Sequence, residues 1–190
     1  ILDQLGNSKY FSTLDLSSGF HQIPMDPHDR EITAFSTPEG HFEFNRMPFD
    51  LKGAPATFQR LMNTVLSGLQ GLKCFVYLDV IVIYGLSLSD HNNKLLDIFE
   101  RLRKFNLKLQ PDKCAFLRKE VIYLGHIIFE DGIKPDSRNI TAVQNFPVPK
   151  KEKDIKAFIG LAGYYRKFIK DFSKITLPLT KLLKKDMKFL

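Results

Sequence analysis

The chain has 190 residues, of which 44% are hydrophobic and 26% are charged. This composition is typical of one or two globular domains with a buried core, and it argues against an intrinsically disordered chain. The longest apolar run, residues 74–84, is shorter than the roughly 20 residues of a membrane-spanning helix and contains Asp79. Two cysteines, Cys74 and Cys114, are too few for a disulfide framework or a zinc site, so we expect reduced thiols. Because residue 1 is Ile and no signal peptide is visible, we expect a piece of a longer chain.

The net charge of +7 is concentrated at one end of the chain. Residues 150–190 contain 12 Lys and Arg against 4 Asp and Glu, a balance of +8. Residues 1–149 contain the other 16 basic and 17 acidic side chains, a balance of −1. Such asymmetry favours a polyanionic partner such as nucleic acid; the alternative is the solvated surface of ordinary helices.

Short strands are predicted from residue 10 onward. The alternation over residues 10–16 predicts a strand with Phe11, Thr13 and Asp15 on one face. Runs of β-branched and aromatic residues bounded by turn residues predict the other strands. These are a hairpin of residues 32–35 and 41–44, a second hairpin of residues 74–77 and 81–84 with its turn at 78–80, and strands near 115–117 and 121–129.

Helices are predicted between these strands and over the C-terminal quarter. Pro55 suits the first turn of a helix over residues 56–66. Ser89 or Asp90 can cap a long amphipathic helix that follows the second hairpin. The C-terminal pattern is helical from residue 137, breaks at 146–149 and restarts near 151. Because strands and helices are mixed and the strand connections are short, the expected fold class is α+β.

Two carboxylates, Asp15 and Asp79, stand at the ends of apolar segments. Burying a lone carboxylate is costly, so each needs a partner, a cation or a solvated edge. Asp15 could simply cap the segment that begins at Ser17, and Asp79 could be an ordinary turn residue. Alternatively, the two carboxylates meet at adjacent strand ends and hold a divalent metal, for which the hard, oxygen-seeking Mg²⁺ is suited.

Five segments, in order along the chain, resemble motifs of retroelement reverse transcriptases. They are residues 11–23 (FSTLDLSSGFHQI), similar to the first catalytic motif; 47–59 (MPFDLKGAPATFQ), similar to the second motif; 77–80 (YLDV), at the place of the Tyr-x-Asp-Asp turn; 123–127 (YLGHI), similar to the primer grip; and 158–169 (FIGLAGYYRKFI), similar to the thumb. The last segment resembles gypsy-class LTR retrotransposons in particular, and insect gypsy-like Pol polyproteins are the nearest resemblance.

The resemblance implies a reverse-transcriptase palm, which is a ferredoxin-like antiparallel sheet with helices, together with partial fingers and a helical thumb. By this analogy residues 1–22 and 54–132 form the palm and residues 23–53 form the partial fingers. Residues 133–190 form the thumb and the start of a connection.

The resemblance also implies which residues bind substrates. Asp15 and Asp79 would be catalytic and would hold Mg²⁺, or alternatively Mn²⁺. Phe20 would exclude a ribose 2′-hydroxyl and so favour dNTPs; the alternative is plain core packing. The other implied contacts are Phe49 and Lys52 for the nucleotide, and Tyr77, Gly125, His126, Lys156, Gly160, Gly163, Tyr164, Arg166 and Lys167 for the nucleic acid. For the two glycines, helix–helix packing is an alternative role, and for Lys52 a solvated loop position.

Three residues depart from the family pattern. Val80 stands where the family has its third carboxylate, and valine cannot coordinate a metal, so we expect a weakened metal site. Asp50 stands where the family usually has Gly and would add bulk and negative charge near a triphosphate. Phe129 stands where relatives tend to be polar. The upstream finger strands of the family are absent from the sequence.

Two functions of different classes follow. The first is the core of a retrotransposon reverse transcriptase, whose family reaction is template-directed DNA synthesis by metal-assisted nucleotidyl transfer on an RNA template, a DNA primer and dNTPs. The second is a catalytically dead, nucleic-acid-binding remnant or domesticated fragment, favoured by Val80 and Asp50. A third, an unrelated RNA-binding module, lacks the expected aromatic motif on its strands.

The family also implies RNase H and integrase regions in the same polyprotein. It implies a cytoplasmic location, in virus-like particles, with nuclear access, and no membrane partner.

Overall fold

The computed structural model describes residue 5 and residues 7–184, the side chain of residue 139 apart. The chain divides into two compact units, Ile1–Val121 with Ile128–Gly132, and Ile122–Ile127 with Ile133–Leu190. Of the predicted palm and thumb, residues 1–4, 6 and 185–190 lie outside the described residues. The division into palm, fingers and thumb at the predicted boundaries stays a prediction. Within the described ranges, none of the helices has the length and apolar character needed to cross a membrane.

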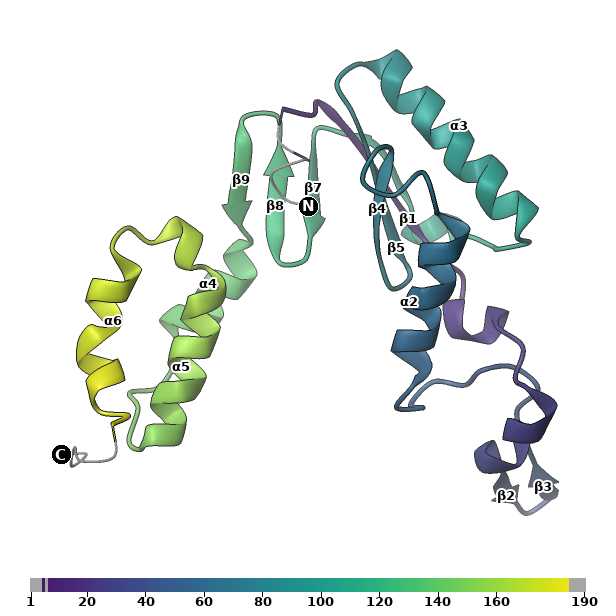
Figure 1. Ribbon diagram of the computed structural model, residues 1–190, viewed down its shortest axis with the longest axis horizontal. Helices are drawn as coiled ribbons and strands as arrows, with labels where there is room; N and C mark the ends of the chain where they lie inside the picture. Colours follow the sequence, from purple (N-terminus) through teal and green to yellow (C-terminus); the bar gives the residue numbers. More distant parts are fainter. Residues whose placement is uncertain (1–4, 6, 185–190) are drawn as a thin grey trace. The chain divides into compact units, whose positions relative to one another are not determined.

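The first unit is built on a four-stranded antiparallel sheet in the order β4-β5-β1-β6 (Figure 1). Its strands are β1 (Tyr10–Asp15), β4 (Cys74–Tyr77), β5 (Val80–Gly85) and β6 (Ala115–Arg118). The predicted strand over residues 10–16 and the predicted hairpin around residue 79 are therefore confirmed. Because β1 pairs on both of its edges, its position in the sheet is fixed from two sides.

One face of this sheet forms the main core with two helices, α2 (Ala54–Val65) and α3 (Leu88–Lys104). Alternate residues of each strand point to this face, as the period of two requires. Fully buried members of the core include Leu14, Phe58, Met62, Val65, Ile81, Ile83 and Ile98. Since Leu14 and Leu16 enter this core, Asp15 between them emerges on the opposite face of the sheet.

The start of α3 corrects one prediction. The helix is capped by Ser87, not by Ser89 or Asp90. The Ser87 hydroxyl accepts the N–H of Asp90 at 3.1 Å, and the Asp90 carboxylate accepts the N–H of Leu86 at 3.1 Å. Together the two bonds satisfy two backbone N–H groups around the start of the helix.

The segment before α2 also differs from the prediction. The sequence predicts a hairpin of residues 32–35 and 41–44, but the paired strands are β2 (Phe35–Thr37) and β3 (Gly40–Phe42). Ile32 instead belongs to a 3₁₀ helix, η2 (Pro27–Thr33). Its cap is Asp26, whose carboxylate accepts an N–H from the first turn, and this local bonding takes Ile32 out of the strand.

A three-stranded sheet follows, in the order β7-β8-β9. Its strands are β7 (Glu120–Tyr123), β8 (His126–Phe129) and β9 (Gly132–Pro135). The single strand predicted over residues 121–129 is wrong, because a turn at Leu124 and Gly125 divides it. Both turn residues have positive φ, 48° and 72°, which reverses the chain within two residues.

The second unit continues with helices that enclose a small core. They are α4 (Ser137–Gln144), α5 (Glu152–Tyr164), the 3₁₀ helix η4 (Arg166–Phe168) and α6 (Phe172–Lys181). Ile155, Ala162 and Tyr165 are buried. The mixture of antiparallel sheets and helices confirms the α+β fold class.

A buried polar network ties β1 to α3 and β6. His91 is fully buried, and its Nε2 lies 2.9 Å from the hydroxyl of Ser12. The same hydroxyl accepts the N–H of Leu117 at 3.1 Å, beside the register shift between β1 and β6. The Nδ1 atom lies 3.3 Å from the side-chain oxygen of Asn92. A neutral ring with its proton on Nδ1 can therefore donate to Asn92 while Nε2 accepts from the hydroxyl of Ser12.

This network predicts a loss of stability on mild acidification. Burial is the main cause that lowers the pKa of His91 below its usual value, so the unfolded chain takes up this proton first. The free energy of unfolding should therefore fall as the pH drops below about 6.5, the ordinary pKa of histidine, and the fall should end below the folded pKa. Urea unfolding between pH 7.5 and 5.5 measures it.

The matched variants are His91→Gln and His28→Gln, because His28 is exposed. We expect the pH dependence to flatten only in His91→Gln. Identical pH profiles of His91→Gln and the wild-type chain would contradict the assignment.

Candidate functional site

Asp15 lies in a row of three side chains that crosses the sheet. It is the last residue of β1 and stands directly opposite Val80 of β5, which in turn stands opposite Tyr77 of β4. Directly opposed residues of antiparallel strands share a face, so the three side chains project from the face away from α2 and α3. Asp15 and Val80 are half-buried, while the ring of Tyr77 is 52% exposed.

Asp79 occupies the turn between β4 and β5, next to this row. The preceding residue, Leu78, has a φ of 53°, and its N–H donates to the side-chain carbonyl of Gln59 at 2.8 Å. The carbonyl of Asp79 accepts the N–H of Leu16 at 3.1 Å. The turn is therefore held both to α2 and to the residue that follows Asp15.

The two carboxylates influence each other electrostatically. The pKa of Asp15 is raised, first by burial and then by the negative charge of Asp79. The ammonium of Lys113, 3.9 Å from Asp15 Oδ1, acts in the opposite direction. Lys113 ends the 3₁₀ helix η3 (Pro111–Lys113), which is fastened to β1 by a 2.8 Å bond from the Gln110 N–H to the Asp15 carbonyl. No local sequence pattern indicates this cation, because Lys113 is distant from Asp15 along the chain.

This arrangement can supply two carboxylates to a divalent cation, and Val80 adds no ligand. Within the part of the chain that the structure describes, no cluster of three or more His, Cys, Asp or Glu side chains could hold a metal. Two hard oxygen donors suit Mg²⁺ or Mn²⁺, which complete their shells with water and phosphate oxygens. Asp15 and Asp79 therefore fit a divalent metal site that has two carboxylate ligands from the protein instead of three.

Phe20 packs against aromatic rings at the start of the 3₁₀ helix η1 (Gly19–Gln22). Its ring centroid lies 5.4 Å from that of Phe49 and 5.4 Å from that of Phe58. Gly19 permits this packing, because a Cβ there would approach the Phe58 ring to 2.7 Å. Phe20 is half-buried. Part of its ring therefore packs in the core, and part is accessible for the predicted contact with a sugar.

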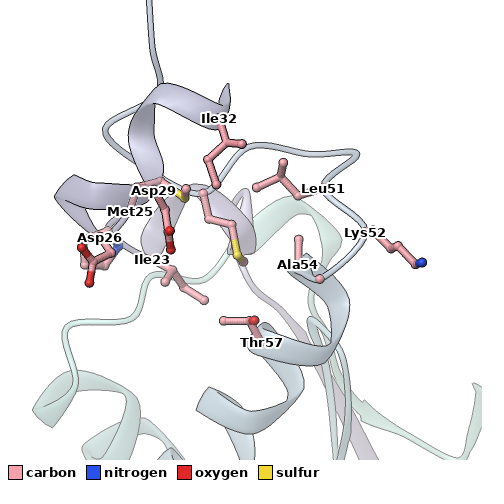
Figure 2. A pocket seen from close by; sticks show the side chains of 12 residues that line it. Ile23, Met25, Asp26, Asp29, Ile32, Leu51, Lys52, Ala54 and Thr57 are labelled. Atoms are coloured by element: carbon pink, nitrogen blue, oxygen red, sulfur yellow. The ribbon is translucent and has the colours of Figure 1, made fainter. Parts of the chain in front are cut away.

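The other predicted nucleotide contacts lie just before α2. Phe49 is 54% exposed and Lys52 is exposed. Lys52 also lines a pocket of about 450 Å³, and Figure 2 shows the end of its side chain directed away from the other labelled residues. Asp50 has a φ of 67°, a conformation that favours glycine.

The predicted nucleic-acid contacts of the second unit gather on α5, η4 and one turn. Gly160, Gly163 and Arg166 line a groove of about 660 Å³ that is closed on its other side by residues of α6. Gly163 comes close to the Phe172 ring, so helix packing is part of its role. The residues without a place in this groove are Lys156 on α5, Tyr164 at its end, Lys167 in η4, and Gly125 and His126 at the β7–β8 turn.

Comparisons with known proteins decide the family. The sequence model described as "Reverse transcriptase (RNA-dependent DNA polymerase)" matches residues 1–128. The chain belongs to the reverse transcriptase family. It is 52% identical over 188 residues to the retrovirus-related Pol polyprotein from transposon 297, and 42% identical over 184 residues to that from transposon gypsy, both of Drosophila melanogaster. These matches cover 99% and 97% of this chain but 18% of each relative, so this reverse transcriptase chain spans under a fifth of either.

Solved structures confirm the fold of this chain. The foamy viral protease-reverse transcriptase in complex with double-stranded DNA superposes with a TM-score of 0.84 at 32% identity, covering 96% of this chain and 32% of that one. The same foamy viral protein in complex with an RNA/DNA hybrid gives a TM-score of 0.74 at 32% identity, covering 95% and 25%. The resemblance to gypsy-class reverse transcriptases and the palm, fingers and thumb fold class are therefore confirmed.

The cross-strand row predicts the effect of restoring a carboxylate at residue 80. Val80→Asp should lower the melting temperature without metal, because three crowded carboxylates repel one another. Mg²⁺ or Mn²⁺ should then raise it by several degrees more than in the wild-type chain, because metal binds only the folded site. Melting curves with and without metal measure both effects.

The matched control is Val148→Asp, since Val148 is 82% exposed and lies in the second unit. We expect its metal response to equal that of the wild-type chain. An equal metal response in Val80→Asp and the wild type would show that residue 80 is not at a metal site.

Proposed function

We propose that this reverse transcriptase chain binds a primer–template, an RNA template paired with a DNA primer, and presents the primer end to the row at the end of β1. The observation that carries this proposal is the row itself, in which Asp15, Val80 and Tyr77 lie side by side with Asp79 at the adjacent turn. The relatives bound to duplex DNA and to an RNA/DNA hybrid support the same class of ligand.

Reverse transcriptases generally use divalent metal ions. We propose that Asp15 and Asp79 would hold Mg²⁺ or Mn²⁺, which when bound supplies charge to activate a primer hydroxyl and steady phosphate oxygens. The exposed ring of Tyr77 offers an apolar surface to the last primer nucleotide. Phe20 limits the space beside the sugar of an incoming dNTP, and the ammonium of Lys113 balances part of the carboxylate charge.

Val80 favours a second candidate function, that of a nucleic-acid-binding protein that does not extend primers. Val80 stands opposite Asp15, where a carboxylate would supply a third negatively charged ligand to the metal ion. Asp50 adds to this effect, because its carboxylate stands in an exposed loop beside the predicted nucleotide contacts. Binding of nucleic acid does not depend on these groups, since it comes from positive charge and exposed rings elsewhere.

The longer relatives suggest further regions in the same polyprotein. RNase H and integrase are the regions that we propose as partners. A cytoplasmic location in virus-like particles, with nuclear access, is proposed on the same grounds.

The two candidate functions differ in primer extension. Because the metal site lacks its third carboxylate, we expect the outcome of the second candidate function for this chain, which is no measurable extension of a DNA primer on poly-rA with Mg²⁺ or Mn²⁺. Incorporation of radiolabelled dNTP measures this, with Asp15→Asn as the control. Robust incorporation that is lost in Asp15→Asn would instead establish the polymerase.

Binding should depend on the basic residues of α5 and η4. The combined change of Lys156, Arg166 and Lys167 to Ala should weaken affinity for a short RNA–DNA hybrid about tenfold or more at low salt, because a protein that neutralises fewer phosphates releases fewer counterions. It should also reduce the slope of log affinity against log salt by about 0.9 for each phosphate that is no longer neutralised. Fluorescence anisotropy over a salt series measures both.

The matched control changes Arg103, Lys104 and Lys119 to Ala. These side chains are exposed in the first unit, and the change in net charge is the same. Equal weakening by both triple variants would mean that net charge alone, not the surface of α5 and η4, governs binding.

A further inference from the structure

The turn between β7 and β8 contains a strained backbone conformation that contacts from neighbouring residues must stabilise. Leu124 and Gly125 connect the strands with φ angles of 48° and 72°. Gly125 adopts this conformation freely, but for a residue with a Cβ such as Leu124 it is strained. Conformations of this kind persist only where neighbouring groups hold them in place.

Both carbonyls of this turn are held by residues of the second unit. The Leu124 carbonyl accepts the hydroxyl of Tyr164 at 2.7 Å and the Nδ1–H of His126 at 2.7 Å. Because a carbonyl can only accept, His126 must carry a proton on Nδ1. The Gly125 carbonyl accepts the N–H of Asp136 at 3.0 Å, at the residue that caps α4.

His126 is enclosed by rings. Its centroid lies 5.4 Å from Tyr164, 5.7 Å from Tyr165 and 5.7 Å from Phe168, and it is only 5% exposed. It therefore has little surface to offer a ligand. Tyr164 differs, because its hydroxyl is bound to the turn while its side chain stays 54% exposed.

We propose that Tyr164 and His126 are positioning residues that clamp the β7–β8 turn to the end of α5. Residues 122–127 group with the helices of the second unit and not with the sheet of the first, as such a clamp requires. The turn and α5 then meet a nucleic acid as one preformed surface, so no ordering of the turn is needed on binding. This last step rests on the proposed function; the clamp itself does not.

The test removes one hydroxyl. Tyr164→Phe keeps the ring and removes the hydrogen bond to Leu124. We expect amide hydrogen exchange across the β7–β8 hairpin to accelerate at least fivefold, and the affinity for a short RNA–DNA hybrid to weaken at least threefold. The matched control is Tyr84→Phe, which removes an equivalent 2.8 Å bond from a tyrosine hydroxyl to the Gly71 carbonyl in the first unit. It should change neither quantity.

A second variant tests His126 separately. His126→Phe keeps an aromatic ring among the other three and removes the Nδ1 donor, so it should accelerate exchange in the same hairpin. The double variant should accelerate it by more than the product of the two single effects, since either donor alone still bonds the shared Leu124 carbonyl and only their joint loss removes both bonds.

The outcomes separate the clamp from the proposed function. Unchanged hairpin exchange in Tyr164→Phe would overturn the clamp, whatever the binding result. Accelerated exchange with unchanged affinity would keep the clamp and overturn the preformed surface. If the wild-type chain does not bind the hybrid, the proposed function fails while the exchange result still decides the clamp.

Discussion

The arrangement of the first unit depends on the pairing of β1 with β5. Six consecutive residues of β1 pair with β5, and the last pair joins Asp15 to Val80. Because strand side chains alternate, this register sends Leu14 into the helix-covered core and Asp15 to the other face. A slip of one residue would bury the carboxylate of Asp15 and expose the side chain of Leu14. The same register therefore determines both the stability of the core and the position of the site.

Much of the fold could be predicted from residue pattern alone. The alternation around Asp15 and the two apolar runs on either side of Asp79 identify the central strands, since their signals are local and strong. Ser87, Ser89 and Asp90 have side chains that can all cap a helix, so the sequence does not single out Ser87. The hydrogen bonds that link Asp90 to Ser87 and to Leu86 identify Ser87 as the cap. The turn at Leu124 was missed because leucine is not a turn residue; a hydroxyl from Tyr164, 40 residues later, holds it.

The candidate site was less predictable than the fold. Family motifs indicate Asp15 and Asp79, and the structure adds what brings them together, a turn tied to α2 through Gln59 and to β1 through Leu16. Lys113 could not be found by any local pattern, because its position beside Asp15 arises from how η3 is fastened to β1. A sequence pattern does not determine which side chains contact a bound nucleotide or nucleic acid. The assignments of the residues that contact them therefore stay predictions.

The central claim is that Asp15 and Asp79 form one cation site beside the β1–β5 pairing. Paramagnetic broadening of backbone amide resonances by substoichiometric Mn²⁺ tests it most directly, because the effect falls steeply with distance from the bound ion. We expect the amides of residues 14–17 and 78–81 to broaden first and Asp15→Asn to abolish the pattern. Broadening that begins elsewhere, or that persists in Asp15→Asn, would contradict it.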